Sequence, residues 1–143
     1  MEWKTGTVLD DLIGREIQFV RVSDTVLLVV ASDLPCAVEV EGDCCSTSWW
    51  ADITGVPQIV GRAVTAIEDL DLSGYDVNDG RGRQEEDQAY GFRIRCGESF
   101  ADFIYRNSSN GYYGGWMQTY RVDALPSGME IVDADWKSTF SEA

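Results

Sequence analysis

The residues with the most evident chemical potential are two adjacent cysteines, Cys44 and Cys45, which follow Asp43. A thiolate is a nucleophile and a metal ligand, and a helix that begins beside it lowers the pKa of the thiol through its dipole. Asp43 acts in the opposite direction, because a neighbouring carboxylate opposes a second negative charge. Cysteine is also among the most frequently buried residue types. We therefore expect Cys44 and Cys45 to be structural, with an activated thiol as the alternative.

The sequence offers little to a metal ion or to acid-base catalysis. Its four cysteines are Cys36, Cys44, Cys45 and Cys96, and no two of them form a C-x-x-C pair. A zinc site built from all four would use two adjacent residues as ligands, which strains a tetrahedral ion. The absence of histidine excludes Ser-His-Asp and Cys-His mechanisms. We expect no metal, no cofactor and no catalytic residue, although a glycosidase-like pair of carboxylates stays open, because sequence does not reveal their separation.

Two adjacent tryptophans, Trp49 and Trp50, form a candidate binding site. The sequence predicts a short helix over residues 47–53, with Ser46 as its N-cap and Gly55 at its end. Neighbouring side chains on a helix point about 100° apart, so both rings cannot face the core. One ring is therefore expected to be partly exposed, where it either anchors a partner or lies along the surface of its own protein.

Residues 110–116 combine turn residues with aromatic side chains. Asn110 begins an Asn-Gly pair, the strongest short signal for a hairpin turn, so we expect this turn to join strands at 99–105 and 112–122. Tyr112 and Tyr113 suit stacking against a base, a sugar or a peptide. The glycines that follow support a purely structural alternative, in which the strand passes close to another backbone.

Acidic residues dominate the charge, with 25 Asp and Glu against 11 Lys and Arg and a net charge of −14. Such a surface repels nucleic acid and anionic membranes, so we expect neither as a direct partner. Glu39 and Glu41 alternate with apolar residues and should share the solvent face of a strand, and Glu68 and Asp69 form a second acidic group. Solubility explains such groups by default, and steering toward a basic partner is the functional alternative.

The hydrophobic pattern predicts a mainly β (α+β) fold, a curled antiparallel or mixed sheet that is barrel- or sandwich-like, with two short helices. Ile17 and Phe19 are expected on one face of the first strand. Residues 1–143 read as one domain with a core at 7–132, an exposed loop at 73–87 and a short C-terminal tail. The expected elements are a helical turn at 7–14 and strands at 15–22, 25–31, 36–41, 62–72, 89–96, 99–105, 112–122 and 129–132.

The chain also contains a faint internal echo. Residues 12–17, Leu-Ile-Gly-Arg-Glu-Ile, resemble residues 59–64, Ile-Val-Gly-Arg-Ala-Val. A shared unit of a turn followed by a strand explains the similarity.

The sequence predicts a cytoplasmic location. No apolar run approaches the roughly 18 residues that span a bilayer, and the first residues are not followed by the apolar stretch of a secretory signal. Thiols stay reduced in the cytoplasm, so the cysteines are expected to be free.

Two segments resemble an uncharacterised family of small proteins found in bacteria and their phages. They are residues 42–53, which contain Asp43-Cys44-Cys45, and residues 109–113, Ser-Asn-Gly-Tyr-Tyr. The resemblance covers roughly residues 10 to 122. Members of this family commonly have a histidine shortly before Asp-Cys-Cys, and this chain lacks it. The resemblance implies a bacterial or phage setting, and no catalytic residue comes with it.

Together these observations favour a phage or prophage accessory protein that binds and masks a host macromolecule without catalysis. A basic nucleic-acid-binding surface of a host protein is the candidate partner, because an acidic protein competes electrostatically with DNA. The alternative is a small-ligand-binding or hydrolytic protein that uses the Asp43-Cys44-Cys45 turn and the hairpin at Tyr112 and Tyr113.

Overall fold

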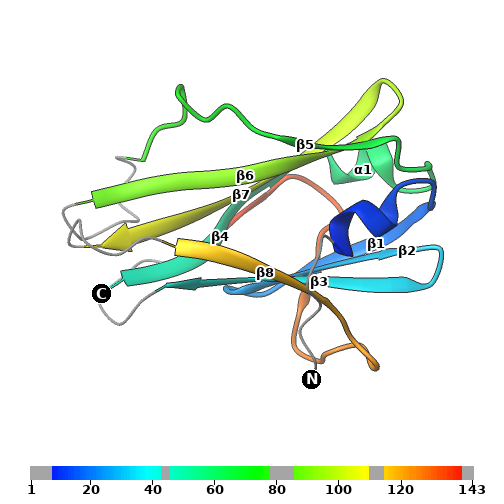
Figure 1. Ribbon diagram of the computed structural model, residues 1–143, viewed down its shortest axis with the longest axis horizontal. Helices are drawn as coiled ribbons and strands as arrows, with labels where there is room; N and C mark the ends of the chain where they lie inside the picture. The colour runs from blue at the N-terminus through cyan, green and yellow to red at the C-terminus, as the bar shows by residue number, and fades with distance from the viewer. Residues whose placement is uncertain (1–7, 43–45, 78–85, 110–114, 140–143) are drawn as a thin grey trace.

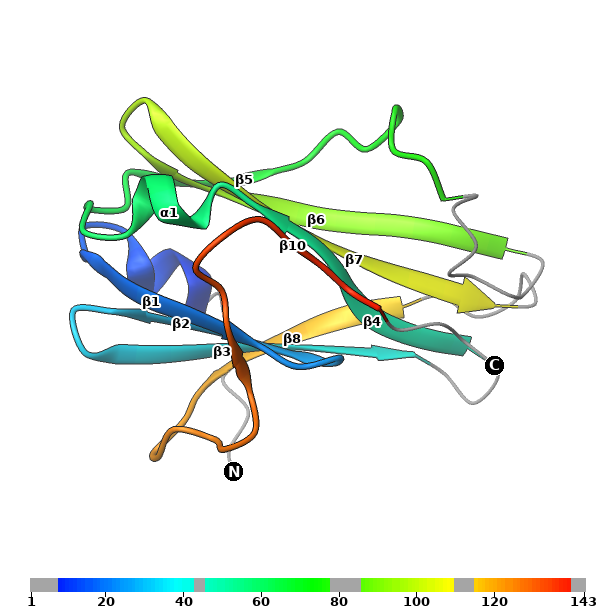
Figure 2. The same cartoon turned by 180° about the vertical axis from the view of Figure 1, so that it is seen from behind.

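The computed structural model describes residues 8–42, 46–77, 86–109 and 115–139. Within these ranges two five-stranded antiparallel sheets pack against each other (Figures 1 and 2). We call one of them the β3 sheet, and its strand order is β8-β3-β2-β1-β9. We call the other the β7 sheet, and its strand order is β10-β4-β7-β6-β5. The strands are β1 (Ile17–Val22), β2 (Val26–Ala31), β3 (Leu34–Gly42), β4 (Ser46–Thr54), β5 (Ala66–Asp69), β6 (Glu86–Cys96), β7 (Ser99–Ser109), β8 (Gly115–Arg121), β9 (Glu130–Ile131) and β10 (Trp136–Lys137).

The mainly β class predicted from the sequence is therefore confirmed. The sheets do not close into a barrel, so the fold is sandwich-like. Two short helical segments accompany the strands, the 3-10 helix η1 (Val8–Leu12) and the α-helix α1 (Val56–Ile59). A proline in its first turn favours α1, because proline has no N–H to leave unpaired there.

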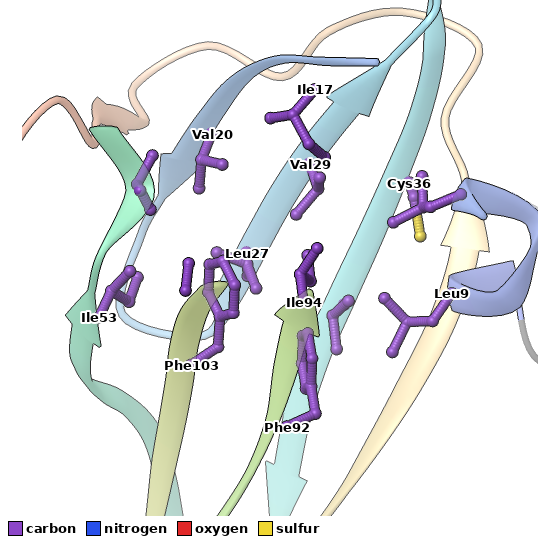
Figure 3. Packing of buried hydrophobic residues seen from close by; sticks show 14 of the residues in the cluster. Leu9, Ile17, Val20, Leu27, Val29, Cys36, Ile53, Phe92, Ile94 and Phe103 are labelled. Atoms are coloured by element: carbon purple, nitrogen blue, oxygen red, sulfur yellow. The ribbon is translucent and has the colours of Figure 1, made fainter. Parts of the chain in front are cut away.

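The main core lies between the two sheets. Figure 3 shows side chains from both sheets and from η1 pointing toward one another, among them Leu27, Cys36, Ile94 and Phe103. β2 is a continuous apolar run between β1 and β3, and it is buried on both faces as its composition predicts. A smaller apolar cluster covers the outer face of the β3 sheet, and its buried members are Leu28, Val30, Ala37, Tyr120 and Val122.

The described chain contains two copies of one unit, a helical turn followed by four strands. The first copy is η1-β1-β2-β3-β4 and the second is α1-β5-β6-β7-β8. In each copy the first three strands form a meander, and the fourth strand crosses to the other sheet. β4 therefore lies beside β7, and β8 lies beside β3. The two sheets are therefore equivalent in strand order, apart from β9 and β10.

The echo in the sequence marks the place where the two copies meet. The N–H of Ile17 donates to the carbonyl of Arg62, and the N–H of Val64 donates to the carbonyl of Arg15. The donor–acceptor distance is 2.9 Å in both hydrogen bonds. In a second reciprocal pair of hydrogen bonds, the N–H of Gly14 donates to the carbonyl of Val64 and the N–H of Gly61 donates to the carbonyl of Ile17, each at 2.8 Å. The repeated sequence therefore encodes a repeated turn, and the two turns bind each other.

The hairpin predicted around Gly97 and Glu98 is confirmed, because β6 and β7 pair across a two-residue turn. The second predicted hairpin is wrong. β8 pairs with β3 from Cys36 to Gly42, and not with β7. The strand predicted at 62–72 is also shorter, since β5 covers only Ala66–Asp69.

The helix predicted over residues 47–53 is wrong. These residues belong to β4, which pairs with β7 and β10. The β-branched and aromatic side chains of this segment favour a strand that is covered on both faces. A further correction concerns β1, where an irregularity between Ile17 and Phe19 rotates the strand. Ile17 enters the main core, while Phe19 packs on the outer cluster.

Candidate functional site

Glu39 and Glu41 lie on the outer face of the β3 sheet, as the alternation with Val38 and Val40 predicts. Both carboxylates face β8, whose register places Gln118 opposite Glu39 and Trp116 opposite Glu41. Directly opposed residues of an antiparallel pair share a face of the sheet. One outer surface therefore carries two acids, an amide and an indole ring, and we call it the β3–β8 face.

Hydrogen bonds from β8 hold the two carboxylates. The hydroxyl of Tyr120 donates to Oε1 of Glu39 over 3.1 Å, and the side-chain amide of Gln118 donates to Glu41. Burial, together with the negative charge of Glu39 and the hydrogen bond to it, raises the pKa of Tyr120 to about 12. The hydroxyl therefore stays protonated and able to donate well above the ordinary tyrosine pKa of 10.0. The charges of the β3–β8 face are thus fixed in position.

Trp116 is the exposed aromatic residue of this face. Its side chain is 41% exposed, and the next residue, Met117, is 37% exposed on the opposite face of β8. From the sequence alone, Trp116 is only the last aromatic residue of the predicted turn at 110–116. The sequence does not reveal the pairing of β8 with β3, which brings this ring beside Glu41.

The apolar end of the same sheet is hollowed. A pocket of about 680 Å³ lies where the chain after β8 passes over Tyr120 and Val122. Val26 and Met129 add apolar surface, while Ser23 and Asp123 are among its polar residues. The volume falls in the range of small-molecule pockets.

Both predicted tryptophans are fully buried, so the expected exposed ring is absent. Because β4 is a strand, the two side chains point to opposite faces of the β7 sheet, and each face is covered. Trp50 enters the main core, where its Nε1 donates to the carbonyl of Val38 over 3.2 Å. Trp49 lies under the guanidinium of Arg106. Neither ring is available to a partner on the surface.

The second acidic group lies on the other sheet. Glu68 accepts a hydrogen bond over 3.0 Å from Arg95 across the β5–β6 pair, and Asp69 is exposed at the end of β5. The structure therefore does not bring Glu68 and Asp69 together with Glu39 and Glu41.

Six predicted site residues lie outside the described residues, namely Asp43, Cys44, Cys45, Asn110, Tyr112 and Tyr113. The residues that flank them are register partners. Gly42 pairs with Gly115, and Ser46 pairs with Ser109. Both crossovers between the sheets therefore start and finish at one end of the sandwich. Buried polar side chains gather next to this end, namely Ser48, Asn107, Ser108 and Ser109.

The cysteines that the structure describes are two free, buried thiols, Cys36 and Cys96. Burial raises the pKa of Cys36 to about 12 and also raises that of Cys96. Among the described residues, no three acidic or cysteine side chains are grouped so that they could hold a metal ion. No helix in the described ranges has the length and apolar character needed to cross a membrane.

Residues 10–118 match the model of a protein family described as a domain of unknown function, DUF7448. The chain belongs to this family. The DUF7448 match begins in η1 and ends within β8, so it includes nearly all of both structural units and excludes β9 and β10. An uncharacterised protein, L278, of Acanthamoeba polyphaga mimivirus is 36% identical over 90 residues, which cover 59% of this chain and 67% of the viral protein. No solved structure matches the chain.

Proposed function

We propose that the protein is a viral accessory protein, of a phage or prophage, that binds and masks a basic surface of a host macromolecule without catalysis. The observation that carries the proposal is the position of Trp116 on the β3–β8 face. The ring is exposed beside Glu41, and Glu39 lies on the same face. An exposed tryptophan provides a rigid anchor, and fixed carboxylates provide complementarity to a cationic partner. The relative in mimivirus supports a viral setting, without deciding for a phage.

A basic nucleic-acid-binding surface is the partner that best fits this chemistry. Such a surface is built to face rows of phosphates, and the net charge of −14 attracts it at long range. Attraction of this kind accelerates encounter, and it weakens as the Debye length falls from about 10 Å at 0.1 M salt to about 3 Å at 1 M.

The test begins with capture of basic partners from host lysate and continues with association kinetics of each purified partner. Reversal of both face carboxylates, Glu39→Lys with Glu41→Lys, should slow association and flatten its dependence on salt. The matched control is Glu98→Lys with Asp133→Lys, which makes the same change of net charge at two exposed positions away from the face. Trp116→Ala should weaken binding by about 30-fold through faster dissociation, as loss of an interface anchor does.

The proposal fails if association does not depend on salt and the two double variants behave alike. In that outcome the acidic surface serves solubility only. Melting temperatures of all variants are measured first, so that a loss of binding is not confused with a loss of folding.

A second candidate function rests on the pocket beside Tyr120. Its volume of about 680 Å³ and its mixed apolar and polar surface fit a small organic ligand. Native mass spectrometry of freshly purified protein tests this candidate. A bound metabolite that is displaced by Val26→Trp would favour it over masking.

A further inference from the structure

The two long sides of the sandwich are equivalent in topology but differ in what covers them. One side lies between β1 and β4, next to which β9 and β10 are added, and the other lies between the edge strands β5 and β8. A helical segment closes one end of each side, α1 on the first and η1 on the second (Figures 1 and 2). Beyond α1, the C-terminal segment covers the β1–β4 side, and Figure 2 shows it passing from β1 to β4.

On the β1–β4 side the chain itself shows how an extended segment docks. β9 pairs with β1 at Arg21 and Val22, and the N–H of Val132 continues this pairing by donating to Val20 over 2.9 Å. β10 then pairs with β4. Val132, which lies between β9 and β10 in the chain, is buried in the main core, and the side chain of Trp136 packs against the same core. One segment therefore adds a strand to each sheet and places apolar side chains between them.

The equivalent β5–β8 side has no such segment among the described residues. β8 is hydrogen-bonded to β3 alone, and β5 to β6 alone. A groove of about 490 Å³ lies on this side, between Met117 of β8 and Asp69 of β5. Its aromatic lining is a stacked pair, Tyr90 and Tyr105, with ring centroids 5.2 Å apart. The groove therefore lies on the side that is equivalent to the one that Val132 and Trp136 fill.

The edge of β8 lacks the usual protection against pairing. Exposed edges in soluble proteins commonly carry lysine, proline or inward-pointing charge. From Gly115 to Tyr120 β8 has no proline and no charged residue. Arg121 ends the strand and makes an ion pair with Asp11 of η1, with 3.7 Å between Nη2 and Oδ2. The strand before this ion pair therefore offers uncharged backbone beside an open groove.

We propose that the β8 edge and its groove receive an extended basic segment of a partner protein, which pairs with β8 and places apolar side chains over Tyr90 and Met117. The proposal rests on the masking function above and names the element of the partner that is held. Asp69 and Asp71 lie exposed beside the groove, and Glu41 lies on the strand next to β8. Basic side chains that alternate with apolar ones would therefore lie near the carboxylate of Asp69 at the groove and near Glu41 on the outer face of the β3 sheet.

A second copy of this chain is the poorer occupant. Each copy carries a net charge of −14, so two copies repel each other when acidic rims approach. A basic strand gains from the same charges.

The test uses a labelled peptide of alternating lysine and valine, capped at both ends, with the full-length protein. Its control is the same peptide with N-methyl groups on alternate residues, which keeps charge and side chains but removes the N–H groups of one edge. We expect saturable binding to the unmodified peptide and about tenfold weaker binding of the methylated one, because at least two hydrogen bonds are lost. Amide hydrogens of Trp116 to Thr119 should exchange more slowly in the complex.

Two variants test whether the peptide binds in the groove beside β8. Met117→Thr keeps a good strand former and shortens the side chain in the groove, so it should weaken peptide binding severalfold. Met129→Thr makes the same change in the pocket on the outer face of the β3 sheet, and it should leave peptide binding unchanged.

The outcomes separate this inference from the masking proposal. If both peptides bind equally and exchange at β8 is unchanged, the inference is wrong, while charge-driven masking survives. If neither peptide binds at low salt, but a captured partner binds through Glu39 and Glu41, the inference is again wrong. Concentration-dependent dimerisation that protects the same amides without peptide would assign the edge to a second copy and also overturn it.

Discussion

The guanidinium carbon of Arg106 lies 5.4 Å from the centroid of the Trp49 ring, and both side chains are fully buried on the outer face of the β7 sheet. The segment after β5 covers them. Nη2 of Arg106 donates to the carbonyl of Val77 over 2.7 Å, and the hydroxyl of Tyr75 donates to Asp52 of β4. A buried cation over an indole ring gains more than an exposed one, because water does not compete. Arg106 therefore fastens this segment to the sheet.

Replacement of Arg106 tests this relationship. Arg106→Ala should lower the free energy of unfolding by about 3 kcal/mol, since it leaves a cavity above Trp49 and removes the hydrogen bond to Val77. Arg106→Met keeps much of the packing and should cost less. Chemical denaturation measures both values.

Arg93→Ala is the control for this prediction. Arg93 is the partly exposed counterpart of Arg106 on the same sheet face, because it pairs with Asp102 at 2.7 Å and its guanidinium carbon lies 3.7 Å from the centroid of the Phe100 ring. Exposed pairs of this kind contribute about 0.2–1 kcal/mol. Equal costs for Arg106→Ala and Arg93→Ala would show that the buried cation has no special structural role.

The reciprocal turns at Gly14 and Gly61 give a second prediction. Their φ angles are +88° and +84°, and an added Cβ would meet no atom closer than 4.0 Å at either position. The cost of Gly14→Ala and Gly61→Ala is therefore conformational, about 1 kcal/mol each. Gly74 has equal space and no positive φ, so Gly74→Ala should be nearly neutral. Unequal costs for Gly14 and Gly61 would argue against equivalence of the two turns.

The sequence predicted best where the determinants are local. Alternation predicted Val38 and Val40 in the core with Glu39 and Glu41 outside, and a two-residue connection predicted the β6–β7 hairpin. The echo around Gly14 and Gly61 also corresponds to a real repeated turn.

The failures share one physical cause. A strand that crosses to the other sheet acquires its partner from a distant part of the chain, and local pattern carries no information about that partner. The local pattern therefore predicts β7 as the partner of β8, although β8 pairs with β3, and it does not reveal the position of Trp116 beside Glu41. The same cause explains Trp49 and Trp50. Ser46 is a suitable N-cap and therefore favours a helix from the local sequence, but pairing with β7 makes residues 46–54 a strand.

The buried thiols give a third prediction. Burial raises the pKa of Cys36 to about 12, so at pH 8 roughly one molecule in ten thousand carries the reactive thiolate. Cys96 has a raised pKa for the same reason. Iodoacetamide at pH 8 should leave both residues unmodified in the native protein and modify both after denaturation, as peptide mass spectrometry will show. Rapid native labelling of Cys36 would contradict the burial that the core packing requires.

The last prediction concerns alkaline pH. Burial is the main cause that raises the pKa of Tyr105 and of Tyr120 to about 12, against an ordinary value of 10.0, and the charge of Glu39 contributes at Tyr120. Both groups are neutral in the folded protein and ionise more easily when it unfolds. Their contribution to stability is therefore complete below pH 10 and is lost as the pH rises from about 10 to about 12.

Melting temperatures measured from pH 8 to pH 12 should fall over this interval. Tyr120→Phe removes the hydroxyl that bonds Glu39, so it should be less stable than the parent at pH 8 and should lose less stability toward pH 12. Tyr105→Phe should reduce the same slope without affecting Glu39. Absorbance at 295 nm supplies the independent check, since Tyr105 and Tyr120 should ionise well above pH 10 in the native protein, and burial also raises the pKa of Tyr90. If Tyr105 and Tyr120 ionise near pH 10 while the protein stays folded, the part-buried hydrogen bond between Tyr120 and Glu39 does not hold the acidic face in place.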